Sequence, residues 1–169
     1  MPRIRIALAV TLALACTRTE HRAAGPMTLS SPAFANNAAI PAKYTCDGAN
    51  VSPPLTIAGV PTDAKSLALT VDDPDAPGGS FTHWLVWKIP PSTTTIAEGQ
   101  HLGTEEQNGF GKPGYGGPCP PSGIHHYHFK LYALDSKLEL TEKADKKAIE
   151  EKMHGHILEQ AELIGLFSK

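Results

Sequence analysis

Three short apolar runs separated by loops rich in glycine and proline constrain the fold of this chain more than any other feature. The runs are Ser66–Pro74, Thr82–Pro90 and His125–Asp135, and each has the length of a strand and is followed by a turn or a polar loop. The chain of 169 residues contains 15 Gly and 15 Pro, which favours many turns and argues against a helical bundle. The pattern predicts a mainly β fold of antiparallel strands.

The third run alternates between apolar and polar residues, and this alternation assigns its two faces. The first set of alternate positions comprises Tyr127, Phe129, Leu131 and Ala133, and the second comprises His126, His128, Lys130 and Tyr132. His125 falls on the same face as Tyr127. We therefore expect an imidazole and a phenol to project together from the start of this strand.

Near the C-terminus the apolar pattern changes to the period of a helix. Thr141 is the expected N-cap and Glu142 lies in the expected first turn. The apolar face comprises Ala144, Ala148, Ile149 and Met153. We expect Gly155 to separate two short helices and the segment "LIGLF" to end the chain as a small strand.

The N-terminal segment "MPRIRIALAVTLALAC" reads as a secretory signal peptide over residues 1–16. Arg3 and Arg5 precede an apolar run that is too short to span a membrane. The residues before Cys16 resemble the cleavage box of bacterial lipoproteins, with ordinary cleavage as the alternative. We expect a flexible tether at residues 17–26 and a single folded domain at 27–169. The protein would then be exported, either to the periplasm or as a lipid-anchored protein of the cell envelope.

Export has a consequence for the cysteines. If lipid consumes Cys16, then Cys46 and Cys119 remain as a pair in an oxidising compartment. A disulfide between them is the hypothesis that follows.

Carboxylates follow the first apolar run in the turn "DDPDAPGG". Asp73 and Asp75 lie on a corner that Pro74 and Pro77 make rigid. Asp75 is expected to accept hydrogen bonds from nearby amides, whereas Asp73 suits either a structural or a functional role. His83 follows near the start of the second run, and its neighbours Phe81 and Trp84 are expected to form an apolar rim.

The loop "GYGGPCPPSGIHH" precedes the third run. Gly114, Gly116 and Gly117 permit backbone conformations that expose consecutive N–H groups, and such nests bind anions. The loop leads to His125 and Tyr127. A concave site with a carboxylate, two imidazoles, a phenol and amide donors suits a small oxyanion such as phosphate or carboxylate.

Other classes of site have weaker support. His126 and His128 share a strand face and could ligate zinc with a third group, but the sequence has no His-Glu-x-x-His or Cys-x-x-Cys motif. An aspartate and two histidines could act as acid and base, yet no Gly-x-Ser-x-Gly nucleophile motif or nucleotide-binding loop is present. The net charge of −2, with no basic stripe, gives no indication of a nucleic-acid partner. We predict no metal and no cofactor.

The motifs "DDPDAP", "HWLVWKIP" and "GYGGPCPPSGIHHYHFKLYALD" resemble the phosphatidylethanolamine-binding protein family, and above all its bacterial branch of Raf-kinase-inhibitor-like proteins. The resemblance runs from about Met27 to Phe167. It implies a large β-sheet packed on a smaller antiparallel sheet, with one or two peripheral C-terminal helices. It also implies a small pocket for anions, including phospholipid head groups. The pocket residues that it implies are Asp73, His83, His125 and Tyr127, with Asp75 supporting the turn and Gly117, Cys119 and Pro121 forming a wall.

These observations favour a binding module that recognises a small anion or a phospholipid head group. The first alternative is a small-molecule hydrolase or lyase that uses the same aspartate and histidines. The second is an envelope protein that regulates a partner protein or a protease. The segment "PGGSF" is shorter than in many family members, which leaves one rim of the expected pocket open.

Overall fold

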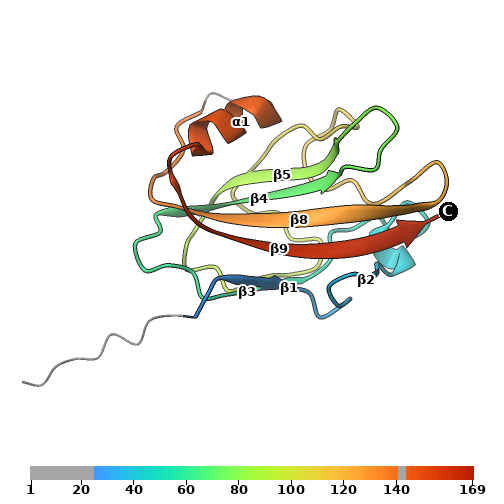
Figure 1. Ribbon diagram of the computed structural model, residues 1–169, viewed down its shortest axis with the longest axis horizontal. Helices are drawn as coiled ribbons and strands as arrows, with labels where there is room; N and C mark the ends of the chain where they lie inside the picture. Colours follow the sequence, from blue (N-terminus) through green and yellow to red (C-terminus); the bar gives the residue numbers. More distant parts are fainter. Residues whose placement is uncertain (1–24, 141–143) are drawn as a thin grey trace, which may run out of the picture.

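Two β-sheets pack face to face, and one α-helix covers part of the outer face of the larger sheet (Figure 1). The computed structural model describes residues 25–140 and 144–169. The predicted signal peptide, Cys16, most of the predicted tether, Thr141 and Glu142 lie outside these residues. No helix in the described residues is long and apolar enough to cross a membrane.

The larger sheet has six strands in the order β2-β9-β8-β4-β5-β7, and all neighbours are antiparallel except β2 and β9. Its strands are β2 (Ala38–Ala39), β4 (Ser66–Asp73), β5 (Phe81–Ile89), β7 (Thr104–Glu105), β8 (Ile124–Leu134) and β9 (Ile157–Ser168). The three long apolar runs predicted as strands are β4, β5 and β8. The smaller sheet is antiparallel with the order β1-β3-β6, formed by β1 (Thr28–Ser30), β3 (Leu55–Ala58) and β6 (Thr95–Ile96). The predicted mainly β sandwich is confirmed.

Alternation along the strands builds the core between the two sheets. On β4 the side chains of Leu67, Leu69 and Val71 point into the sandwich. On β8 the predicted apolar face, from Tyr127 to Ala133, is buried in the same core. A 3-10 helix, Ala42–Tyr44, closes one end of this core with Tyr44.

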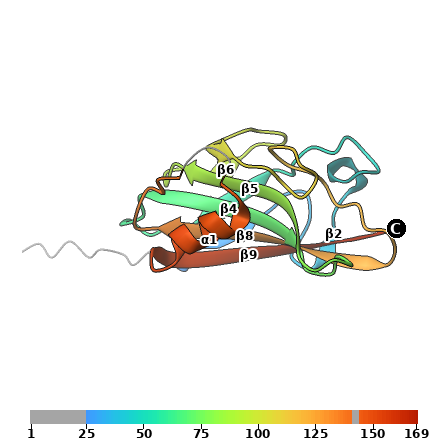
Figure 2. The same ribbon diagram turned by 90° about the horizontal axis from the view of Figure 1, so that it is seen from above.

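A second apolar cluster lies on the outer face of the large sheet, under helix α1 (Lys146–Met153). Ile149 and Met153 are buried there against residues such as Trp87. The N-cap of this helix is Asp145, not the expected Thr141, because the Asp145 carboxylate accepts a hydrogen bond from the Ala148 N–H. Figure 2 shows that α1 lies against the outer face of the sheet, and its first residue, Lys146, forms an ion pair of 2.8 Å with Asp72 near the end of β4.

The expectation of a second helix after Gly155 is wrong. Gly155, with φ of 81°, forms the turn after α1, and the chain then continues as the single long strand β9. Leu, Glu, Gln and Ala in this segment favour a helix by intrinsic propensity. Pairing with β8 along nearly the whole length of both strands overrides that preference. The segment "LIGLF" is the end of this strand rather than a separate one.

Candidate functional site

The predicted site residues gather at the end of the sandwich where β4 ends and β8 begins. Asp73 continues the inward face of β4 after Leu69 and Val71. His125 and Tyr127 continue the inward face of β8 in the opposite direction. Antiparallel pairing of β4 with β8 therefore brings a carboxylate and an imidazole together from positions far apart in the sequence.

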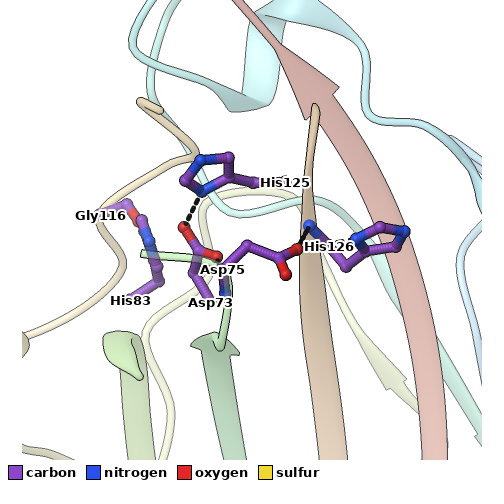
Figure 3. A network of polar contacts seen from close by, with 6 residues as sticks. All are labelled: Asp73, Asp75, His83, Gly116, His125 and His126. Atoms are coloured by element: carbon purple, nitrogen blue, oxygen red, sulfur yellow. Dashed lines mark hydrogen bonds and ion pairs between the residues drawn. The ribbon is translucent and has the colours of Figure 1, made fainter. Parts of the chain in front are cut away.

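Asp73 and His125 form a buried pair. The His125 Nδ1–H donates to Asp73 Oδ2 at 2.7 Å, and the side chains are only 8% and 5% exposed (Figure 3). The other oxygen, Oδ1, accepts a hydrogen bond from the Asp75 N–H at 2.9 Å. Both oxygens of Asp73 are thus engaged, and the ring nitrogen Nε2 is the atom of His125 left to meet a ligand.

His83 reaches the same place because β5 contains a β-bulge. Val71 pairs with Trp84 and Asp72 pairs with Thr82, so His83 is an extra residue on β5. Its Nδ1–H donates to the Gly116 carbonyl oxygen at 2.6 Å. Its ring lies edge-on to the Tyr127 ring, with centroids 5.1 Å apart. Burial lowers the pKa of His83 below its usual value, so the ring is neutral near pH 7.

Tyr127 is fully buried beside these histidines. Its hydroxyl group is one of two buried side-chain polar atoms without a hydrogen-bond partner in the described residues, the other being Thr70 Oγ1. Burial, followed by the nearby Asp73 charge, raises the pKa of Tyr127 above its usual value, so the phenol keeps its proton. A buried donor without a partner costs free energy, and a ligand that accepted its hydrogen bond would remove that cost.

Asp75 supports the turn and lies apart from this cluster. Its Oδ2 accepts hydrogen bonds from the His126 N–H and ring Nδ1–H, on the more exposed side of the strand (Figure 3). These bonds hold the pKa of Asp75 below its usual range. His128 pairs with Glu162 at 2.8 Å. In the part of the chain that the structure describes, no group of three or more histidine, cysteine, aspartate or glutamate residues is arranged to hold a metal ion.

The glycine-rich loop does not form the expected anion nest. The Gly116 N–H donates to the His83 carbonyl oxygen and the Gly117 N–H donates to Asn50 Oδ1, so both amides already have partners. These glycines permit close packing instead. A Cβ on Gly117 would lie 2.6 Å from the Tyr44 carbonyl oxygen, and a Cβ on Gly116 would enter the Phe110 ring. Trp84 is also placed differently from the expected rim, because it points into the main core.

A cavity of about 280 Å³ adjoins the buried cluster. Phe110 belongs to its wall and also packs on His83, with ring centroids 5.5 Å apart. Gly117 and Cys119 of the predicted wall line the cavity, whereas Asp73, His83, His125, Tyr127 and Pro121 do not. In this structure Phe110 and Gly116 therefore separate the open cavity from the polar cluster.

Two asparagines that were not predicted from the sequence, Asn50 and Asn108, line this cavity. Asn108 is buried and donates to the Gly114 carbonyl oxygen, while its Oδ1 accepts from the Phe110 N–H. Asn50 has a positive φ of 56° and holds the Gly117 amide. The pair Asn108-Gly109 is a turn signal in the sequence and would have pointed to this loop.

Cys46 and Cys119 form a disulfide, with their Cα atoms 5.4 Å apart. The bond joins the loop after the 3-10 helix to the loop that carries Gly116 and Gly117. The Cys46 N–H also donates to the Pro118 carbonyl oxygen at 3.0 Å. The disulfide thereby holds together two loops that form opposite parts of the cavity wall.

Comparison with known proteins agrees with this fold. The sequence profile of the family described as phosphatidylethanolamine-binding protein matches residues 30–168. A UPF0098 protein of Pyrococcus horikoshii is 49% identical over 151 residues, which cover 82% of this chain and 75% of that protein. A UPF0098 protein of Methanothermobacter thermautotrophicus is 48% identical over 150 residues, covering 85% of this chain and 99% of its own. The chain belongs to the phosphatidylethanolamine-binding protein family.

Two solved structures extend the comparison. A phosphatidylethanolamine-binding protein homologue from Chlamydia trachomatis superimposes with a TM-score of 0.83 at 42% identity. E. coli YbcL, described as a member of the mammalian PEBP family, superimposes with a TM-score of 0.78 at 31% identity. Each comparison covers 85% of this chain and 98% of the other. The resemblance that the sequence motifs indicated is confirmed.

Proposed function

We propose that this protein binds a small anion, or the anionic head group of a phospholipid, at the cluster of Asp73, His83, His125 and Tyr127. The observation that carries the proposal is the buried Tyr127 hydroxyl without a partner, beside two imidazoles that each have one nitrogen committed to the protein. An oxyanion supplies the acceptors that this set of groups needs.

The roles of the four residues differ. His83 and Tyr127 donate hydrogen bonds to the ligand, and His83 takes up a proton when it does so. His125 presents its ring nitrogen Nε2 to the ligand, and its bond to Asp73 keeps the ring oriented. Asp73 makes the site selective for a partner that carries a proton or an ammonium group near the anion, because its negative charge is buried beside the ligand.

The ligand enters from the cavity beside Phe110 in this proposal. Phe110 is 49% exposed, so its ring can turn outward at a lower cost than a buried side chain. The size of the cavity, about 280 Å³, suits a small ligand. The name of the family, phosphatidylethanolamine-binding protein, supports the choice of a head group carrying a phosphate and an ammonium.

Export to the periplasm or the cell envelope is part of the same proposal. The disulfide between Cys46 and Cys119 supports it, because disulfides persist in oxidising compartments. Attachment to the membrane through a lipid on Cys16 would place a head-group-binding protein next to its ligands.

Calorimetric titration of residues 27–169 with phosphate, acetate and phosphoethanolamine tests the binding proposal. We expect saturable binding that falls by about tenfold or more in His83→Ala, since a hydrogen bond to a charged group is lost. His154→Ala is the matched control, because His154 is exposed and lies in the turn after α1. Circular dichroism of each variant shows whether it is folded. Absence of binding in the unaltered protein, or equal binding in both variants, would overturn the proposal.

A further inference from the structure

A second cavity, of about 300 Å³, lies at the opposite end of the sandwich from the candidate site. Its lysines come from three segments: Lys65 precedes β4, Lys88 is the second-last residue of β5, and Lys137 follows β8. Asp73 lies at the other end of β4, about 25 Å away at the usual rise per residue of a strand. The two cavities are therefore separate sites.

Within the described residues, the lysines of this cavity have no acidic partner within 4 Å. Ion pairs within 4 Å involve the other lysines Lys43, Lys130, Lys146, Lys147 and Lys169. In residues 25–140 and 144–169, five lysines form no ion pair: Lys65, Lys88, Lys112, Lys137 and Lys152. Three of them, Lys65, Lys88 and Lys137, line the same cavity. Glu139 is the acidic residue of the lining, so the wall carries a net positive charge.

The backbone at Lys88 is unusual. Leu69 pairs with Val86 and Leu67 pairs with Ile89, so Trp87 and Lys88 oppose the single residue Ala68 in a second bulge. Lys88 has φ of 58°, and the other positive-φ residues that are not glycine in the described chain are two asparagines, a type that tolerates this conformation. The bulge places the Lys88 ammonium 4.4 Å from the centre of the buried Trp87 ring. Strained backbone of this kind is concentrated at functional sites.

We propose that Lys65, Lys88 and Lys137 form a second anion site that takes a phosphate-bearing ligand. Three ammonium groups on flexible stems can direct several N–H donors to one phosphate group. Ile89, Pro90 and Pro91 supply an apolar surface beside them, against which the rest of the ligand packs. The phosphate belongs either to a soluble phosphorylated molecule or to an anionic lipid at a membrane surface.

The position of this cavity is a reason to test an anionic lipid separately from a soluble phosphate. The described chain starts at Gly25, at the same end of the sandwich as the three lysines (Figure 1). Pro26 packs closely against Gly59, which lies in the connection that leads to Lys65. A Cβ added to Gly59 would lie only 2.6 Å from the Pro26 carbonyl oxygen. A protein anchored through the residues before Gly25 would bring this lysine end close to the surface that holds the anchor.

The test uses the variant Lys65→Gln/Lys137→Gln and the matched control Lys147→Gln/Lys152→Gln, which removes the same charge outside the cavity. Both pairs are exposed, so neither is expected to unfold the protein. Each is combined with His83→Ala, so that phosphate binding at the candidate site does not contribute. Binding of the first probe, inorganic phosphate, is measured by calorimetry. The second probe is vesicles of phosphatidylglycerol and phosphatidylcholine in equal parts, with pure phosphatidylcholine vesicles as the neutral reference.

We expect the control pair to bind at low ionic strength and the cavity variant to bind about tenfold more weakly, with both losing affinity as salt is added. A difference seen with inorganic phosphate identifies a soluble ligand, and a difference seen only with phosphatidylglycerol vesicles identifies a lipid. Equal affinities of the two variants for both probes would overturn the proposal. Failure of the control pair, which carries His83→Ala, to bind either probe would also overturn the proposal and would leave the candidate site intact.

Discussion

The two histidines of the candidate site are each held by a contact that leaves one ring nitrogen free for a ligand. Asp73 has both oxygens engaged, and the two histidines each use Nδ1 for a contact within the protein. The hydroxyl of Tyr127 is the exception, since it is buried with no partner in the described residues. A residue whose polar atom is unused in the free protein can be changed with little loss of stability, which separates its structural role from its binding role.

Tyr127→Phe is therefore expected to keep or slightly raise the free energy of unfolding, while lowering phosphate affinity. The removed hydroxyl makes no hydrogen bond, and deleting a buried unpaired donor can gain on the order of 1 kcal/mol. Urea unfolding and calorimetric titration measure the two effects. Thr70→Val is the control, because Thr70 Oγ1 is the other buried side-chain atom without a partner among the described residues and lies on the opposite face of β4. Equal losses of affinity in both variants would show that Tyr127 has no special role.

The depressed pKa of His83 gives a pH dependence with a definite sign. Binding of an anion favours the imidazolium, and the ring is neutral near pH 7 in the free protein, so affinity should fall as the pH rises through neutrality and level off at acid pH, where the free protein already carries the proton. Stability follows the same group, since the unfolded chain takes up the proton first and the folded protein loses stability below about pH 6.5. Titration with sulfate, whose charge is constant in this range, measures the effect. A flat affinity profile between about pH 5 and 8 would contradict it.

At the scale of elements, strands were predictable where their burial alternates over many residues. The faces of β8 could be assigned from the sequence, and the inward positions of His125 and Tyr127 follow from that alternation. The bulge that presents His83 depends on the register between β4 and β5, which the sequence of one strand does not contain. The same holds for β9, where pairing with β8 outweighs the helical propensity of its residues. Strands of two to four residues, such as β2 and β3, are too short to leave a periodic signal.

Helix α1 is expected to stabilise the fold without contributing to the site. Ile149→Ala removes a fully buried side chain from the cluster on the outer face of the sheet, which should lower the free energy of unfolding by about 3 kcal/mol. Phosphate affinity should stay the same, because Ile149 packs on the outer face of the sheet, whereas Asp73, His125 and Tyr127 lie on its inner face. Glu151→Ala, on the exposed face, is the control with little change expected in either property. Weakened binding in Ile149→Ala would mean that the two faces of the sheet are coupled.

At the scale of the whole molecule, the site depends on segments that are distant in the sequence. Asp73, His83 and His125 come from three strands, and the cavity beside them is completed by loops joined through Cys46 and Cys119. The sequence pattern indicated these residues individually, and the family resemblance indicated that they converge. The separation of the cavity from the polar cluster by Phe110 and Gly116 required the three-dimensional packing of the loops.

The disulfide is expected to stabilise the whole domain, because it closes a long segment of chain. Cys46 and Cys119 are 73 residues apart, and a crosslink of that span restricts the unfolded chain by about 4 kcal/mol. Cys46→Ser/Cys119→Ser should lower the free energy of unfolding by roughly 2–4 kcal/mol in urea titration. The unaltered protein treated with dithiothreitol should match the variant. Equal stability of the oxidised, reduced and mutated proteins would contradict this role.

The order of strands in the large sheet affects how the chain can fold as it is synthesised. Strand β9 is synthesised after the other described strands, yet it lies between β8 and β2, and β2 is synthesised much earlier. The large sheet therefore cannot be completed before β9 has been synthesised, and β2 has no strand to pair with until then. Pairing between segments so distant in the sequence slows folding.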